Sequence, residues 1–230
     1  MEKIEIFGIQ FDNLTMDEAV EKISGFVVLP YSEFVVRAQK DEEFRNILNK
    51  ADFCLCESRG LYLMARVLGK RLKQEINGVE LIYKLNQKSK IKNQKIFLLG
   101  GNEDVVKKTA EKLGDSVIGF EHGYQDLNKV IGKINSVKPE ILLVGLGSPK
   151  QEKFIYENLS KMPSVKLAIG VGGSFDFISG RVRRAPKVLQ EIGLEWLWRL
   201  ILEPRRAKRI FRGVGGLTWL TIKNMLSLKS

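Results

Sequence analysis

Three glycine-rich turns are the part of this sequence best suited to chemistry on an anionic ligand. They are Gly100-Gly101, Gly145-Leu146-Gly147-Ser148-Pro149 and Gly170-Val171-Gly172-Gly173-Ser174, and each follows a short apolar run. Glycine lets a backbone approach a ligand closely, and helices that begin after such turns offer free N–H groups to phosphates. Together the turns predict a nucleotide or diphosphate ligand, although Gly100-Gly101 taken alone can also be an ordinary tight turn.

The common phosphate-binding and metal-binding signatures are missing from the sequence. There is no G-x-x-x-x-G-K-[ST], and no G-x-G-x-x-G followed by a helix and an acidic residue about 20 positions later. There is also no Asp-x-Asp pair and no His/Cys cluster, and the single histidine, His122, is predicted to order its loop. We therefore expect no cofactor and no metal, and expect Lys, Arg and backbone N–H groups to neutralise a bound diphosphate.

A parallel sheet is needed to bring the three turns together. Short apolar runs alternate with amphipathic stretches, the pattern of an α/β fold with a mostly parallel sheet flanked by helices. In such a sheet the turns gather at the carboxyl edge, where ligands bind. The predicted strands are 95–101, 116–120, 140–147 and 165–173, and the predicted helices are 102–114, 125–137 and 148–161.

The N-terminal part carries weaker signals of the same kind. We expect strands near 4–7, 26–29 and 53–56. Thr15 with Glu18 three residues later is a capping-box signature and predicts the start of a helix. Cys54 and Cys56 alternate along the last of these strands, so they face the same side and are predicted to be reduced thiols, as in a cytosolic protein.

The positive charge of the chain is concentrated at its C-terminal end. The net charge is +11, and from Arg181 onward 12 Lys and Arg stand against three Asp and Glu, which leaves +2 for the first 180 residues. In this segment Pro204 should start a new helical turn, and the glycines at 213, 215 and 216 should break the helix. The stretch 217–228 then forms a last amphipathic helix, with one face made by Trp219, Ile222 and Leu226.

Such a basic segment predicts a polyanionic partner. In EWLWRLILEPRRAKRIFR, residues 195–212, basic residues are interleaved with Trp, Leu and Ile, which favours the surface of an anionic membrane over nucleic acid. Trp196 and Trp198 can instead pack into the core. The N-terminus lacks a signal-peptide pattern, and no run reaches the roughly 18 apolar residues of a membrane span, so any attachment is expected to be peripheral.

Three ordered motifs carry a family resemblance. LLVGLGSPKQEKFI, AIGVGGSFDFISGRVRRAP and GLEWLWRLILEPRR resemble the WecG/TagA/CpsF glycosyltransferases, family 26 of these enzymes, and the likeness begins at IFGIQFDNLTMDEAV. It implies a Rossmann-like catalytic domain over 1–190 and a membrane-docking appendage over 191–230. It also implies inverting transfer of a sugar, typically N-acetylmannosamine, from a UDP donor to a polyprenyl-diphosphate-linked sugar, without an essential metal. The location implied is the cytoplasmic membrane face, and homo-oligomers can form when the appendage is displaced.

The resemblance also implies roles for individual residues. Glu57, in Cys56-Glu57-Ser58, stands where the family has an aspartate that acts as the base. Gln151 would contact the nucleotide sugar, with Lys150 or Arg184 near its phosphates. The substrate-binding set is Gly100, Gly101, Gly145, Gly147, Pro149, Lys150, Gln151, Glu152, Gly172, Gly173, Phe175, Asp176 and Arg184. The set for the membrane or the acceptor diphosphate is Arg199, Arg205, Arg206, Lys208, Arg209 and Arg212.

Other interpretations of these residues stay open. Lys150 and Glu152 can be a solvated helix start, Asp176 a helix cap, Arg184 a surface cation and Glu57 a loop carboxylate. The chain also departs from the family pattern at Leu29-Pro30-Tyr31 and at Glu75, where the family has Thr-Pro-Asn and an arginine. The alternative function is therefore a family member that binds nucleotide sugar at the membrane but has lost or changed catalysis.

Overall fold

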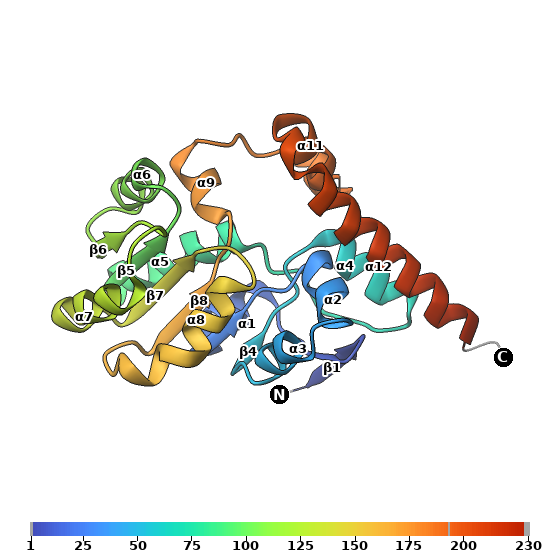
Figure 1. The fold of residues 1–230 in the computed structure, drawn as a ribbon, viewed down its shortest axis with the longest axis horizontal. Helices are drawn as coiled ribbons and strands as arrows, with labels where there is room; N and C mark the ends of the chain where they lie inside the picture. The colour runs from blue at the N-terminus through green and yellow to red at the C-terminus, as the bar shows by residue number, and fades with distance from the viewer. Residues whose placement is uncertain (1, 193, 228–230) are drawn as a thin grey trace.

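The computed structural model describes residues 2–192 and 194–227 (Figure 1). Its centre is a parallel sheet which, within these residues, has six strands in the order β4-β3-β8-β7-β5-β6. The strands are β3 (Gly25–Val28), β4 (Phe53–Cys54), β5 (Ile96–Gly100), β6 (Val117–Glu121), β7 (Ile141–Gly145) and β8 (Leu167–Gly170). The predicted α/β class and its central strands are confirmed, although β4 is shorter than the predicted 53–56.

Helices cover both faces of the sheet because the central strands are apolar on both sides. One face packs against α1 (Met16–Lys22), α5 (Gly78–Lys92), α6 (Glu103–Leu113) and α9 (Ser174–Ser179). The other face packs against α2 (Ser32–Ala38), α3 (Glu42–Asn49), α4 (Arg59–Val67), α7 (Leu127–Val137) and α8 (Lys150–Asn158). Cys54 and Cys56 are free and buried, as predicted.

The N-terminus forms a separate hairpin, and the sequence predicted only one of its two strands. The predicted strand near 4–7 is β1 (Lys3–Ile6), and it pairs in antiparallel fashion with β2 (Ile9–Asp12), which was not predicted. The turn between them has positive φ at both Phe7 and Gly8, which matches the right-handed twist of a two-residue hairpin.

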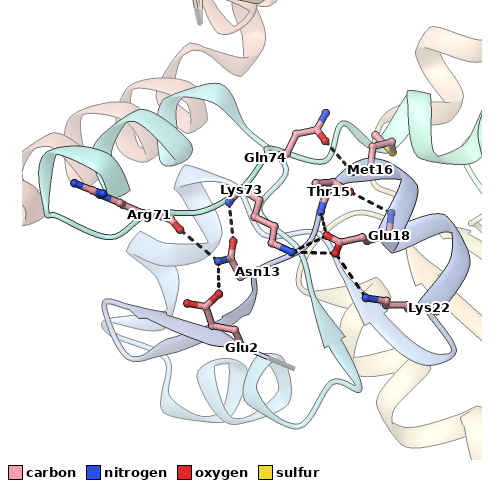
Figure 2. A network of polar contacts seen from close by, with 9 residues as sticks. All are labelled: Glu2, Asn13, Thr15, Met16, Glu18, Lys22, Arg71, Lys73 and Gln74. Carbon is pink, nitrogen blue, oxygen red and sulfur yellow. Dashed lines mark hydrogen bonds and ion pairs between the residues drawn. The ribbon is translucent and has the colours of Figure 1, made fainter.

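A polar network fastens the segment before α5 to the start of α1 (Figure 2). The capping box is present, since Thr15 and Glu18 each accept the other's backbone N–H. Lys73 Nζ lies 2.9 Å from Glu18 Oε1, and the Lys73 N–H donates to Asn13 Oδ1 at 2.6 Å. Gln74 accepts the backbone N–H of Met16 at 2.8 Å. These contacts hold the segment that leads to Gly78, the first residue of α5.

The C-terminal segment contains α10 (Lys187–Glu191), α11 (Glu195–Leu202), a 3-10 turn at Pro204–Arg206 and α12 (Ala207–Ser227). The predicted new turn at Pro204 is confirmed, but the predicted break at the glycines is wrong, because α12 runs unbroken across α2 and α4 (Figure 1). A Cβ on Gly213 would lie 3.3 Å from the backbone nitrogen of Glu33, and one on Gly216 would lie 2.8 Å from Val36. These glycines allow close helix packing, which outweighs their low helix propensity.

Candidate active site

The three glycine turns lie side by side at the carboxyl edge of the sheet. Gly100 of β5 is opposite Gly145 of β7, and Val144 of β7 is opposite Gly170 of β8. Gly100 has a φ of +130°, and a Cβ there would lie 2.3 Å from the carbonyl carbon of Gly145. The close approach of two backbones therefore requires glycine at position 100, which goes beyond the needs of an ordinary tight turn.

Gln151 ties two of these turns together. Its Oε1 atom accepts hydrogen bonds from the backbone N–H groups of Gly147 at 3.1 Å and Gly172 at 3.0 Å. Its Nε2 atom donates to Glu152 Oε1 at 2.6 Å. Both side chains are buried, with 2% of Gln151 and 0% of Glu152 exposed. We call this pair the clasp, since it fixes the position of one turn relative to the other.

The carboxyl of Glu152 is enclosed in protein. Burial raises its pKa to about 7, although the hydrogen bond from Gln151 acts in the opposite direction. Its Oε2 atom is buried and has no hydrogen-bond partner within the described residues. Glu152 is therefore not part of a solvated helix start. The sequence held a signal for this burial, because both clasp residues share a helical face with Phe154 and Ile155.

Glu57 lies between the end of β4 and the start of α4. Its backbone N–H donates to Pro30 O at 3.0 Å, and the next residue, Ser58, caps α4. A Cβ on Gly78 would lie 2.6 Å from Glu57 Oε1 and 3.0 Å from Ser174 Oγ, so the carboxyl lies close to the third glycine turn. The sequence analysis missed Gly78, whose only signal is its position after the N-cap Asn77.

The surroundings of Glu57 change its acidity. Removal from water raises the pKa of its carboxyl to about 8 from the ordinary 4.5. The N–H of Gly78 and the guanidinium of Arg199 lower this pKa, whereas the carboxylates of Glu195 and Glu152 raise it. Glu57 is half-buried, and it is the closeness of its carboxyl to Gly78 and Ser174 that distinguishes it from a solvated loop carboxylate. A pKa near the working pH suits a general base, since the group then combines basicity with a useful ionised fraction.

Arg199 of α11 brings a cation to the third glycine turn. Its guanidinium lies 4.8 Å from the ring centre of Phe177, and a Cβ on Gly173 would lie 2.7 Å from Nη2. Nε is 3.0 Å from Glu203 Oε2, and Nη2 is 3.7 Å from Asp176 Oδ2. Nη2 is also buried without a hydrogen-bond partner among the described residues. A half-buried guanidinium whose Nη2 atom lacks a hydrogen bond, beside a glycine turn, is suited to an anionic group of a ligand.

The other predicted donor-side cations, Arg184 and Lys150, have hydrogen-bond partners within the chain. Arg184 donates to Gln190 Oε1 at 2.8 Å and lies 3.7 Å from both Glu80 and Glu195, so it joins α10, α11 and α5. Lys150 is exposed, and its Nζ donates to the carbonyl of Gly123 at 3.4 Å. The roles of both residues at the donor phosphates stay predictions.

At both places where the chain departs from the family pattern, a polar side chain, Glu75 or Tyr31, has bonding partners in this structure. Glu75 forms an ion pair with Arg59 at 3.0 Å. Tyr31 donates its hydroxyl to Glu33 at 3.2 Å, and Arg209 of α12 contacts both of these side chains. Arg209 therefore holds α12 against α2 and the segment before it. Its predicted place at a membrane or an acceptor diphosphate is not visible in these contacts.

The outer face of α12 is apolar and exposed. Trp219, Ile222 and Leu226 have 59%, 52% and 65% of their surface exposed on one helix, which confirms the predicted shared face, and Phe211, which was not part of that prediction, is 60% exposed. The neighbouring cations Arg205, Lys208 and Arg212 are also exposed, and the side chain of Arg206 lies outside the described residues. Among the helices that the structure describes, none is long and apolar enough to cross a bilayer.

No metal site appears among the described residues, because no three His, Cys, Asp or Glu side chains converge there. Nδ1 of His122 accepts the backbone N–H of Tyr124 at 3.2 Å, so this histidine orders its own loop.

The parallel sheet and the groups at its carboxyl edge define a class, the α/β proteins that bind ligands beyond the ends of their strands. The model of the WecG/TagA/CpsF glycosyltransferase family matches residues 4–230. The chain therefore belongs to this family, as its three motifs predicted.

Several curated relatives carry the name N-acetylglucosaminyldiphosphoundecaprenol N-acetyl-beta-D-mannosaminyltransferase. The protein from Bacillus subtilis strain 168 is 35% identical over 196 residues, which is 83% of this chain and 76% of the relative. The protein from Staphylococcus aureus strain NCTC 8325 is 29% identical over 224 residues, 90% of this chain and 88% of the relative.

Proposed function

We propose that this chain is an inverting hexosyltransferase. It moves N-acetylmannosamine, or a related hexose, from a UDP donor to a sugar on a polyprenyl diphosphate in the synthesis of cell-envelope polysaccharide or teichoic acid. The family and the names of the relatives support the transferred sugar and the acceptor. The observation that carries the proposal is Glu57, a carboxyl of raised pKa placed beside the glycine turns.

In the proposed reaction, the acceptor hydroxyl oxygen attacks the anomeric carbon on the side opposite the UDP group. The bond from this carbon to the UDP oxygen breaks, so the configuration inverts and UDP leaves with the bonding electrons. Ionised Glu57 takes the proton of the hydroxyl. Arg199, and the N–H groups of the glycine turns that are not already bonded to Gln151 or to a backbone carbonyl, stabilise the charge that develops on UDP. The clasp holds two of these turns in fixed positions relative to each other. Lys150 is the proposed contact of the donor phosphates.

The proposed location is the inner face of the cell membrane, with 191–230 as the docking appendage of a catalytic domain spanning 1–190. The apolar outer face of α12 with its neighbouring cations supports this placement, because Trp favours the interface and basic groups are attracted by anionic headgroups. The appendage also carries Arg199, so docking and completion of the site involve the same segment.

The test is a transfer assay with the full chain, a short-chain polyprenyl-diphosphate N-acetylglucosamine acceptor and a panel of UDP-sugars. UDP release and lipid product are measured together. Glu57→Gln should lower kcat by about 100-fold to 10,000-fold, which is the usual contribution of a general base. The control is Glu157→Gln, an exposed glutamate of α8, which should retain activity. Unchanged transfer by Glu57→Gln would remove this residue from the mechanism.

The second candidate is a family member with altered or lost catalysis. It is favoured by the Arg59–Glu75 pair and by the Tyr31–Arg209 contact, which occupy positions where the family pattern differs. Protein that binds UDP and vesicles but yields no product with any donor would support this candidate. Product with one donor would support the first proposal and name its sugar.

A further inference from the structure

A cationic cleft lies beside α4, outside the candidate active site. It has a volume of about 580 Å³ and is lined by Tyr62, Arg66, Arg71 and Leu72. The guanidinium of Arg66 lies 5.9 Å from the ring centre of Tyr62. Both arginines are exposed, and neither has an ion-pair partner among the described residues.

Two other cations of this region are neutralised within the chain, whereas Lys70, between Arg66 and Arg71 in the sequence, is exposed and adds a further positive charge. Arg59 pairs with Glu75, and Lys73 pairs with Glu18 (Figure 2). Arg66 and Arg71 therefore stand out as two guanidinium groups that share a cleft without an acid. Guanidinium groups bind phosphates well because their planar donors match the phosphate oxygens.

Apolar side chains accompany this charge. Leu63 and Val67 of α4 have 38% and 54% of their surface exposed. The helix packs directly beside α12, whose outer face is apolar as well (Figure 1). Exposed aliphatic groups next to unpaired arginines fit the surface of an anionic bilayer, where headgroups meet the acyl region.

We propose that α4 makes a second membrane contact, outside the appendage. Arg66 and Arg71 bind the phosphate of an anionic phospholipid, and Leu63 and Val67 enter the interface. This inference rests on the proposed membrane attachment and adds to it a lipid class and a site in the catalytic domain. Two contacts, α4 and α12, fix the orientation of the protein on the membrane, which one helix alone leaves free to rotate.

The experiment is flotation of the full chain with phosphatidylcholine vesicles, with and without phosphatidylglycerol. The double variant Arg66→Gln/Arg71→Gln should bind the anionic vesicles about 30-fold more weakly, because each basic group near the surface strengthens binding about fivefold. Arg66→Lys/Arg71→Lys retains the charge and should retain most of the affinity. The matched control is Lys107→Gln/Lys108→Gln on α6, which removes the same charge from exposed positions elsewhere and should bind as the wild type does.

The outcomes separate this inference from the proposed function. Equal weakening by the α4 and α6 variants would mean a general charge effect and would overturn the inference. The inference would also be overturned if Phe211→Ser/Trp219→Ser lost vesicle binding while the arginine variant bound as the wild type does. That result would leave the proposed docking by the appendage intact. Absence of vesicle binding by the wild type, or its binding to duplex DNA instead, overturns both membrane proposals. Transfer to a short-chain acceptor in detergent is measured separately and should not change in the arginine variant.

Discussion

Glu152→Gln is the sharpest test of the clasp, because it removes one ionisable group and little else. The amide is similar in shape to the neutral carboxyl, and its oxygen can still accept the hydrogen bond from Gln151. In the wild type, burial raises the pKa of Glu152 from the ordinary 4.5 to about 7. The native state therefore binds this proton more tightly than the unfolded state does.

The sign of the effect follows from this raised pKa. The stability that Glu152 contributes is fully present below about pH 4.5, declines as the pH rises, and is lost once the pH passes about 7. Such a shift corresponds to about 3 kcal/mol of unfolding free energy, a large part of the 5–15 kcal/mol typical of a domain. The variant has no such loss, so it should equal the wild type near pH 4.5 and exceed it by about 3 kcal/mol near pH 8.5.

Urea unfolding at the two pH values measures this difference. At the higher pH the midpoint of the variant should lie about 1 M above that of the wild type. Glu157→Gln, at an exposed position of the same helix, should show no pH-dependent difference. All other groups titrate alike in the variant and the wild type. Their contributions therefore cancel when the unfolding free energies of the two proteins are subtracted. A stability difference that is the same at both pH values would refute the assignment of a buried, largely neutral Glu152.

Three further predictions concern packing and the clasp. Gly216→Ala should lower the melting temperature, because its Cβ would lie 2.8 Å from Val36, whereas Gly215→Ala, with open space around its Cβ, should stabilise α12 by up to about 1 kcal/mol. Arg209→Gln should speed proteolysis of the C-terminal segment, because it loses the ion pair that holds α12 to α2. Gln151→Ala should cost about 2–4 kcal/mol in urea unfolding, since two backbone N–H groups and a buried carboxyl lose partners.

The sheet could be predicted from the sequence because its central strands are continuous apolar runs. Runs such as 96–100 and 141–144 are buried on both faces, and their order along the chain alternates with amphipathic helices. The unbroken α12 could not be predicted in the same way. Its glycines signal a break by propensity alone, and their actual role depends on contact with α2, nearly 180 residues earlier in the chain.

The candidate site, too, could be predicted from the sequence only in part. The glycine turns were visible because each follows a strand, and parallel pairing brings strand ends together. The position of Gly78 against Glu57 was not visible, because it depends on how the network around Lys73 folds the preceding segment back onto α1. The burial of Gln151 and Glu152 was not predicted either, although both share a helical face with Phe154 and Ile155; periodicity could not in any case show which backbone groups a buried amide joins.

The substitutions at the N-terminal half of the site argue for remodelling of the pocket over decay. A decayed site accumulates buried polar groups without partners, each costing about 1–3 kcal/mol. Here Glu75 has gained Arg59, and Tyr31 has gained Arg209, so the replaced positions are bonded. Nine buried side-chain atoms of the described residues lack a hydrogen-bond partner, and only Nε of Arg59 belongs to these substituted pairs; two of the others are Oε2 of Glu152 and Nη2 of Arg199. The Glu152 carboxyl is enclosed in protein, whereas Nη2 of Arg199 lies against the third glycine turn, where a ligand would supply the missing bond.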